Sequence, residues 1–140
     1  MQAFVRVSDQ PIRLHCAVVS PDFVVVIDRT LLETGAVTEG LSDGPLVADS
    51  PVSPKEFADK LGQTDGSVAT VNPLQIALGT AGGPYTNIPR LGALVRAAEL
   101  APLDFLETIV RDALVSKIGE DKAQSNLEGL RQAYEEVMIT

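Results

Sequence analysis

The stretch Pro21-Asp22-Phe23-Val24-Val25-Val26-Ile27-Asp28 decides the fold that this sequence predicts. Its five consecutive apolar residues, Phe23 to Ile27, are mostly β-branched and do not alternate with polar residues. A short run of this kind is typical of a strand buried on both faces, as the central strands of parallel sheets are. Helices must then cover both faces of the sheet. We therefore predict an α/β fold with this stretch as its central strand.

Further elements follow on either side of this stretch. An alternating pattern predicts a first strand at Ala3–Val7, and a turn follows at Ser8–Pro11. The later strands and helices are predicted from apolar runs, helix starts with proline, and helical stripes. They are a short extended piece at Ile12–Cys16, strands at Leu46–Ala48 and Ser67–Val71, helices that start at Ser53-Pro54 and Asn72-Pro73, and a helical region from Asn87 almost to residue 140.

Length and composition indicate one ordinary domain, residues 1–140. The chain is 45% hydrophobic and 21% charged, which is typical of a globular protein. Its formal charge of −8 argues against nucleic acid, because phosphate contacts need clustered Lys and Arg. We see neither a signal peptide nor the roughly 20 apolar residues of a membrane span, and we predict a cytoplasmic protein without membrane contact.

Residues that could carry chemistry are few. His15 and Cys16 are neighbours on a predicted extended piece, so their side chains point to opposite faces and do not form a nucleophile–base pair. We expect a partly buried thiol beside a surface imidazole. The single cysteine and single histidine leave no set of ligands for an iron–sulfur cluster or a transition metal. Gly79–Gly83 is glycine-rich but lacks a following Gly-Lys-Ser/Thr, and we interpret it as a helix stop. We predict no catalytic residues and no metal site.

Asp28 is the one carboxylate in a suggestive place, at the carboxyl end of the predicted central strand. Ligands in parallel α/β sheets bind beyond these strand ends. The same aspartate can simply cap the turn that follows it, and this is the favoured interpretation. Asp22 and Asp49 are interpreted as ordinary turn residues.

Several stretches together resemble one family, the gamma subunits of 2-oxoacid:acceptor oxidoreductases of the pyruvate:ferredoxin type. Each stretch is modest alone, but their order along nearly the whole chain is specific. They are Ala3–Arg13, Pro21–Asp28, Val71-Asn72, Ile76–Leu78, Asn87–Leu94 and Asn126–Glu135. The resemblance implies a Rossmann-like three-layer domain with a mostly parallel sheet and a helical C-terminal half.

One departure from the family pattern stands out. A gamma domain of this family normally opens with a strand and a Gly-x-Gly-Gly-Gln-Gly loop, and only then reaches the Arg-Val-Ser-Asp-x-Pro-Ile segment. This sequence starts at that later segment, so we expect an N-terminally short gamma-type domain. In the family the glycine loop receives the phosphates of coenzyme A, as backbone donors at a helix start can do.

The resemblance implies a non-catalytic subunit of a complex that oxidatively decarboxylates a 2-oxoacid to acyl-CoA and carbon dioxide. The expected partners are alpha, beta and delta-type subunits, which hold thiamine diphosphate and the iron–sulfur clusters and pass electrons to ferredoxin or NAD. Coenzyme A is the one cofactor this chain is expected to touch. Arg6 and Asn87 lie in matching motifs and are the candidate contacts, although a strand-surface charge and a helix N-cap explain them equally well.

Two other hypotheses stay open from the sequence. The chain could be a stand-alone small-ligand or phosphate-responsive α/β module centred on Asp28. It could also be a scaffold with the same partner subunits but without contact to coenzyme A.

Overall fold

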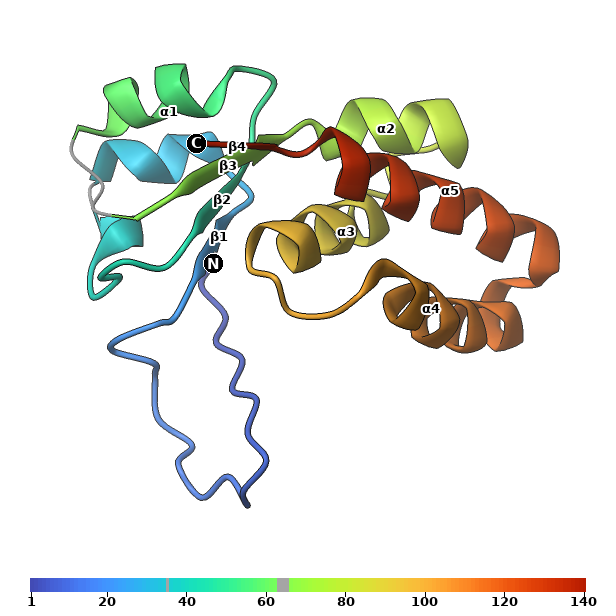
Figure 1. Cartoon of the computed structure of the whole chain (residues 1–140), viewed down its shortest axis with the longest axis horizontal. Helices are drawn as coiled ribbons and strands as arrows, with labels where there is room; N and C mark the ends of the chain where they lie inside the picture. The colour runs from blue at the N-terminus through green and yellow to red at the C-terminus, as the bar shows by residue number, and fades with distance from the viewer. Residues whose placement is uncertain (35, 63–65) are drawn as a thin grey trace.

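The computed structural model describes residues 1–34, 36–62 and 66–140. A small sheet lies beside a bundle of helices, and an extended arm leaves the molecule on the side of the N-terminus (Figure 1). The strands are β1 (Val24–Val26), β2 (Leu46–Asp49), β3 (Val68–Val71) and β4 (Met138–Ile139). The α/β class and the helical C-terminal half are confirmed.

The four strands are hydrogen-bonded in the order β1-β2-β3-β4. β1 pairs with β2 and β2 with β3 in parallel, whereas β4 runs antiparallel to β3 with Thr70 opposite Met138. The mostly parallel sheet is therefore confirmed. β4 was not predicted, because two residues are too short to show a strand period.

The prediction that Phe23–Ile27 is the central strand is wrong. β1 lies at the edge of the sheet, and within it Val26 alone is buried. The central strands are β2 and β3, whose residues are buried except for the half-buried Asp49. A run without alternation indicates cover on the two faces of a strand and carries no information about its lateral neighbours. The predicted cover is itself incomplete, since Ile27 is 61% exposed.

The first helix forms where its start signals predict it. In α1 (Pro54–Leu61), the Ser53 hydroxyl accepts a hydrogen bond from the Glu56 backbone N–H at 3.3 Å. The helix ends at Gly62, whose φ of +84° suits a glycine. The Phe57 side chain of α1 is buried against apolar residues of β1, β2 and β3. Two 3-10 helices, Arg29–Thr34 and Ala36–Thr38, connect β1 to β2.

The C-terminal half consists of α2 (Pro73–Thr80), α3 (Asn87–Ala97), α4 (Leu103–Ile118) and α5 (Glu120–Glu136). α5 packs against α2, α3 and α4 and is the centre of this half (Figure 1). Its apolar stripe includes Leu127 and Leu130, which are both buried. α3 approaches α5 closely at Gly92, where a Cβ atom would lie 2.3 Å from the Leu130 carbonyl oxygen. Glycine therefore permits this contact.

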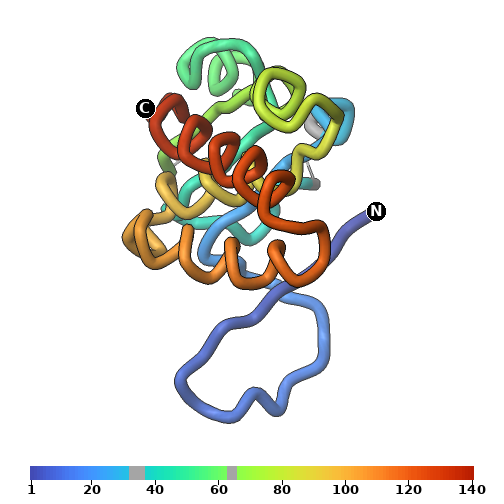
Figure 2. The backbone as a smooth tube through the Cα atoms, turned by 90° about the vertical axis from the view of Figure 1, so that its right-hand side faces the viewer, coloured from blue at the N-terminus to red at the C-terminus, as the bar shows by residue number. Residues whose placement is uncertain are grey.

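Residues 1–20 form the arm, which projects from the rest of the molecule in both views (Figures 1 and 2). The predicted strand at Ala3–Val7 is wrong, and the piece expected to be extended at Ile12–Cys16 pairs with no strand. Strand residues need a neighbouring strand for their backbone hydrogen bonds, and no described segment provides one here. The predicted turn after Val7 is present, with the Gln10 N–H donating to the Ser8 hydroxyl at 3.0 Å.

None of the helices in the described ranges is both long enough and apolar enough to cross a bilayer.

Candidate functional site

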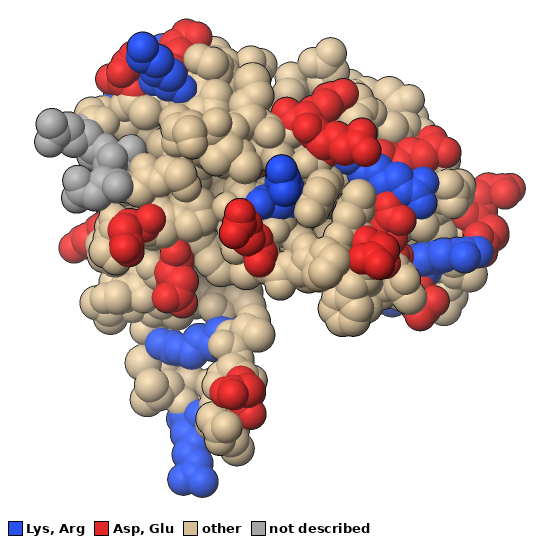
Figure 3. All heavy atoms as spheres, viewed as in Figure 1, with Lys and Arg blue, Asp and Glu red and all other residues tan. Residues whose placement is uncertain are grey.

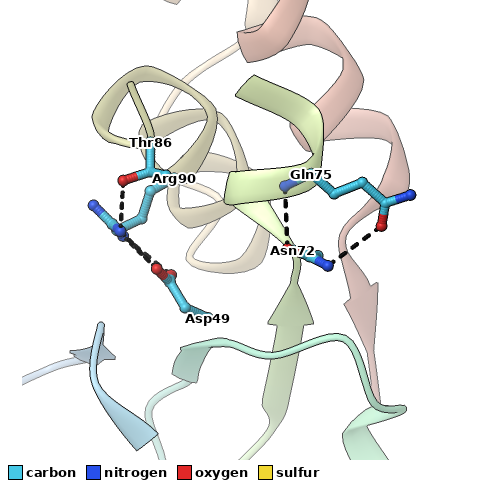
Figure 4. Close-up of polar contacts among 5 residues, drawn as sticks. All are labelled: Asp49, Asn72, Gln75, Thr86 and Arg90. Carbon is cyan, nitrogen blue, oxygen red and sulfur yellow. Dashed lines mark hydrogen bonds and ion pairs between the residues drawn. The ribbon is translucent and has the colours of Figure 1, made fainter. Parts of the chain in front are cut away.

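The carboxyl ends of β2 and β3 lie at one edge of the sheet and carry a group of polar side chains (Figure 4). Asp49 is the last residue of β2, and Asn72 follows directly after β3. Parallel α/β sheets place their ligands beyond this edge, because the loops and helix starts there surround an open crevice. This edge is therefore the candidate site.

An ion pair between Asp49 and Arg90 dominates this edge. The Arg90 Nε lies 3.0 Å and 3.1 Å from the two Asp49 carboxylate oxygens, and Nη2 lies 2.6 Å from Oδ2. Nη2 also donates to the Thr86 hydroxyl at 3.0 Å. The two charged side chains are only 16% and 15% exposed. A two-point contact with so little exposure is far less screened by water than a surface pair, so it fixes the start of α3 against the end of β2.

Asn72 caps the neighbouring helix, α2. Its Oδ1 accepts a hydrogen bond from the Gln75 backbone N–H at 3.2 Å, and its Nδ2 donates to the Gln75 side-chain oxygen at 3.3 Å. The first bond satisfies one of the free N–H groups of the first helical turn. Pro73 occupies the first position of α2, where a missing N–H costs nothing. The predicted helix start is thus confirmed in detail.

A pocket of about 250 Å³ opens beside Asn72, between α2, α5 and the strand ends. It is lined by Ser50, Pro51, Val71, Asn72, Gln75, Ile76, Gln132, Glu136 and Met138. Pockets for drug-sized ligands usually measure about 300–1,000 Å³, so this one fits a small polar group or one end of a larger ligand. Its polar lining consists mainly of amides, which donate and accept hydrogen bonds, and one carboxylate, which accepts them. None of the lining side chains is positively charged.

The two residues predicted to contact coenzyme A lie in different parts of the structure. Arg6 is in the arm, where its guanidinium donates to the carbonyl oxygens of Cys16 at 2.8 Å and Ala17 at 3.2 Å. Asn87 is the exposed first residue of α3, and its side chain has no hydrogen-bond partner among the described residues. The N-cap position belongs to Thr86, so the interpretation of Asn87 as an N-cap is wrong by one residue.

Asp28 behaves as a capping residue. Its Oδ1 accepts hydrogen bonds from the Thr30 N–H at 3.0 Å and the Thr30 hydroxyl at 2.8 Å. These two bonds, the backbone one first, lower the pKa of the exposed Asp28 carboxyl below its ordinary value of 3.8. The favoured interpretation of Asp28 as a cap is confirmed.

The remaining sequence candidates do not form a reactive cluster. His15 and Cys16 are both exposed on the arm, so the expectation of a partly buried thiol is wrong. Gly82, with a φ of +68°, lies in the break after α2, which agrees with a helix stop. Within the described ranges, no three His, Cys, Asp or Glu side chains come together as metal ligands would.

Comparison with known proteins identifies the family. The family model described as pyruvate ferredoxin/flavodoxin oxidoreductase matches residues 1–136. The pyruvate synthase subunit PorC of Thermotoga maritima is 38% identical over 137 residues, which cover 98% of this chain and 71% of that protein. The common subunit gamma of the pyruvate/ketoisovalerate oxidoreductases of Pyrococcus abyssi is 37% identical over 138 residues, with 98% and 72% covered.

The fold agrees with this match. The crystal structure of the pyruvate oxidoreductase subunit PORC from Thermotoga maritima superimposes with a TM-score of 0.76 at 35% identity, covering 88% of this chain and 67% of that one. The chain belongs to the pyruvate ferredoxin/flavodoxin oxidoreductase family. It is a gamma-type member, as the resemblance implied.

Within this gamma-type chain, sequence reasoning missed the ion pair at the strand ends. Asp49 was interpreted as an ordinary turn residue, but it ends β2 and binds Arg90 from α3. Two signals were available: a carboxylate directly after the apolar run Leu46–Ala48, and an arginine in the family motif Asn87–Leu94. Nothing in either local pattern joins them, because 41 residues separate the partners.

Proposed function

We propose that this chain is the non-catalytic gamma subunit of a complex that oxidatively decarboxylates a 2-oxoacid to acyl-CoA and carbon dioxide. The observation that carries the proposal is the family match over residues 1–136, with relatives that are themselves named as oxidoreductase subunits. In this proposal the complex works in the cytoplasm and passes its electrons to ferredoxin or NAD.

The chemistry of the complex is assigned to partner subunits of the alpha, beta and delta types. Iron–sulfur clusters are held by several cysteine thiolates, and this chain has one cysteine, Cys16. Thiamine diphosphate and the clusters therefore belong on the partners in this proposal, and the gamma subunit packs against them.

Contact with coenzyme A is the finer part of the proposal. When bound, coenzyme A supplies the thiol that accepts the acyl group. The pocket beside Asn72 is too small for the whole coenzyme and is lined by neither Arg6 nor Asn87, so a contact at these two residues would lie outside it. Asn87 has a free amide that can donate and accept, whereas Arg6 already uses its guanidinium on the Cys16 and Ala17 carbonyls. We expect the larger contribution from Asn87.

The test is an anaerobic purification of the affinity-tagged chain from its native source. We expect brown, cluster-bearing subunits to co-elute and to oxidise a 2-oxoacid in a reaction that requires coenzyme A. A colourless chain that elutes alone would overturn the assignment.

The coenzyme contact is tested separately in the assembled complex. Asn87→Ala should raise the KM for coenzyme A several-fold, and Arg6→Ala should raise it less. Asn126→Ala, on α5, is the matched control that leaves this KM unchanged, because the Asn126 amide donates within its own helix to the Lys122 carbonyl. An unchanged KM in both test variants would contradict the contact and leave the chain a scaffold.

A further inference from the structure

The arm, residues 1–20, presents apolar side chains to water on both of its limbs. None of the three apolar clusters found in the described residues includes an arm residue. The large apolar side chains that are exposed, with their exposed fractions, are Met1 115%, Phe4 45%, Val5 83%, Val7 92%, Ile12 43%, Leu14 65% and Val19 80%. Scattered exposed apolar residues are ordinary, but seven within one projecting segment are a concentration of exposed apolar side chains.

The total accessible surface area of the chain is larger than expected for a folded monomer of its mass. The chain exposes 9001 Å². A folded monomer of 14.8 kDa is expected to expose about 7,000 Å², which leaves an excess of about 2,000 Å². A standard specific interface buries about 1,600 Å² in total, about 800 Å² of it on each partner. The excess is thus large enough to supply one side of such an interface.

The arm also differs from the rest of the chain in charge. It holds two of the eleven Lys and Arg residues and one of the nineteen Asp and Glu residues, so its formal charge is +1 and the remainder carries −9. Acidic and basic side chains both lie on the visible face of the main body, and the arm shows basic side chains together with an acidic one (Figure 3). The arm therefore suits a surface with carboxylates around it.

Arg6 holds the arm in a defined shape. Its guanidinium donates to the carbonyl oxygens of Cys16 and Ala17, which are ten and eleven residues further along the chain. These bonds join the outgoing limb of the arm to the returning limb. A segment already held in one shape loses less conformational entropy when it binds a partner.

We propose that the arm is a docking element that inserts its apolar side chains into an apolar groove with an acidic rim on a catalytic subunit of the same complex. This inference rests on the proposed function, which supplies the partner. A second copy of this chain fits less well, because the pocket that the described residues form beside Asn72 is small and mainly polar. An extended segment of 20 residues needs a longer and more apolar groove.

The experiment compares two double variants with the wild type, each as a tagged chain purified anaerobically from the native source. The arm variant carries Val5→Asp and Val7→Asp, and the control variant carries Phe105→Asp and Ile109→Asp. The second pair is the matched control, since Phe105 and Ile109 are exposed apolar residues of α4, 59% and 51% exposed, outside the arm. We expect the arm variant to recover about tenfold less partner subunit per tagged chain, and the control to recover as much as the wild type. Circular dichroism should show both variants folded, because all four side chains face water.

The outcomes separate the two proposals. If the wild-type chain recovers no partner subunits, the proposed function fails. If the wild type and the arm variant recover them equally, or if the control loses them as well, the arm inference alone fails. Sedimentation of the isolated chain gives the last outcome: a dimer that the arm substitutions convert to monomer would assign the arm to a second copy and overturn the inference.

Discussion

Arg90 and Asp49 join two halves of the chain by a two-point ion pair at the carboxyl edge of the sheet (Figure 4). Asp49 belongs to the last strand before α1, and Arg90 belongs to the first turn of α3. Thr86 adds a third polar contact to the same guanidinium at 3.0 Å. The pair is the principal polar link between the sheet and the helical half among the described residues, so its removal should be felt in the stability of the whole domain.

Arg90→Met should lower the free energy of unfolding by about 2–3 kcal/mol, because it leaves a carboxylate that is only 15% exposed without its charged partner. Chemical denaturation followed by circular dichroism measures this change. Arg111→Met is the matched control, since the Arg111–Glu120 pair is 55% and 54% exposed and should contribute less than about 1 kcal/mol. Equal losses in the two variants would contradict the special role of the Asp49–Arg90 pair.

Gly92→Ala should destabilise the domain by about 1–3 kcal/mol. The added Cβ would lie 2.3 Å from the Leu130 carbonyl oxygen, so α3 and α5 must move apart. Thermal unfolding measures the effect.

The control for this substitution is Gly79→Ala in α2, where an added Cβ meets nothing within 4 Å. There alanine should raise stability by up to about 1 kcal/mol, since it restricts the unfolded chain and favours the helix. The prediction is wrong if both substitutions change stability in the same direction.

Asn72→Ala should lower the free energy of unfolding by about 1 kcal/mol, because it removes the cap on α2. Asn72→Ser keeps an oxygen that can accept from the Gln75 N–H, so it should recover most of this loss. Denaturant midpoints of the three proteins provide the measurement. An unchanged midpoint in the alanine variant would show that water replaces the cap without cost.

Asp28 should titrate below its ordinary pKa of 3.8, because the Thr30 N–H and hydroxyl favour its charged form. A pKa lowered by folding adds stability above the unfolded pKa, and this stability is lost as the pH falls through the folded value. Asp28→Asn removes this titration. As the pH falls below about 4, the variant should therefore lose less of its free energy of unfolding than the wild type does.

Thr30→Ala provides the check on the cause of this shift. It removes the hydroxyl bond and keeps the larger backbone contribution, so the pKa of Asp28 should rise only part of the way to 3.8. The carboxyl carbon signal of Asp28 followed by NMR against pH measures the pKa in both proteins. A wild-type value at or above 3.8 would contradict the prediction.

Local signals were enough to predict much of the fold. Ser53 and Asn72 each accept a hydrogen bond from the third residue beyond them, and each precedes a proline, so the start of α1 and of α2 can be recognised within four residues of sequence. The stripe of α5 repeats over 17 residues, which is long enough for its period to be clear. These elements are determined by neighbours in the chain.

The features that were missed depend on residues far apart in sequence. Ala3–Val7 has the alternation of a strand, but a strand needs a partner, and the pattern of five residues contains none. The pairing of β4 with β3 joins Ala69 to Ile139 and Thr70 to Met138 across about 70 residues of sequence, and the Val68 N–H donates beside it to the Thr140 hydroxyl at 3.0 Å. The order of the strands and the Asp49–Arg90 pair are likewise properties of the folded chain, which is why Asp49 could not be recognised as part of a polar site.

The position of β4 has a consequence for how the protein is made. β3 has its parallel partner β2 before it in the chain, whereas its other partner follows residues 72–137 and is synthesised last of the four strands. At about 5–20 residues per second, the ribosome leaves this edge of β3 open for roughly 3–13 s. An open strand edge is a template for wrong pairing, so the nascent chain is most vulnerable to aggregation in this interval. The arrival of Met138 and Ile139 then closes the sheet on this side.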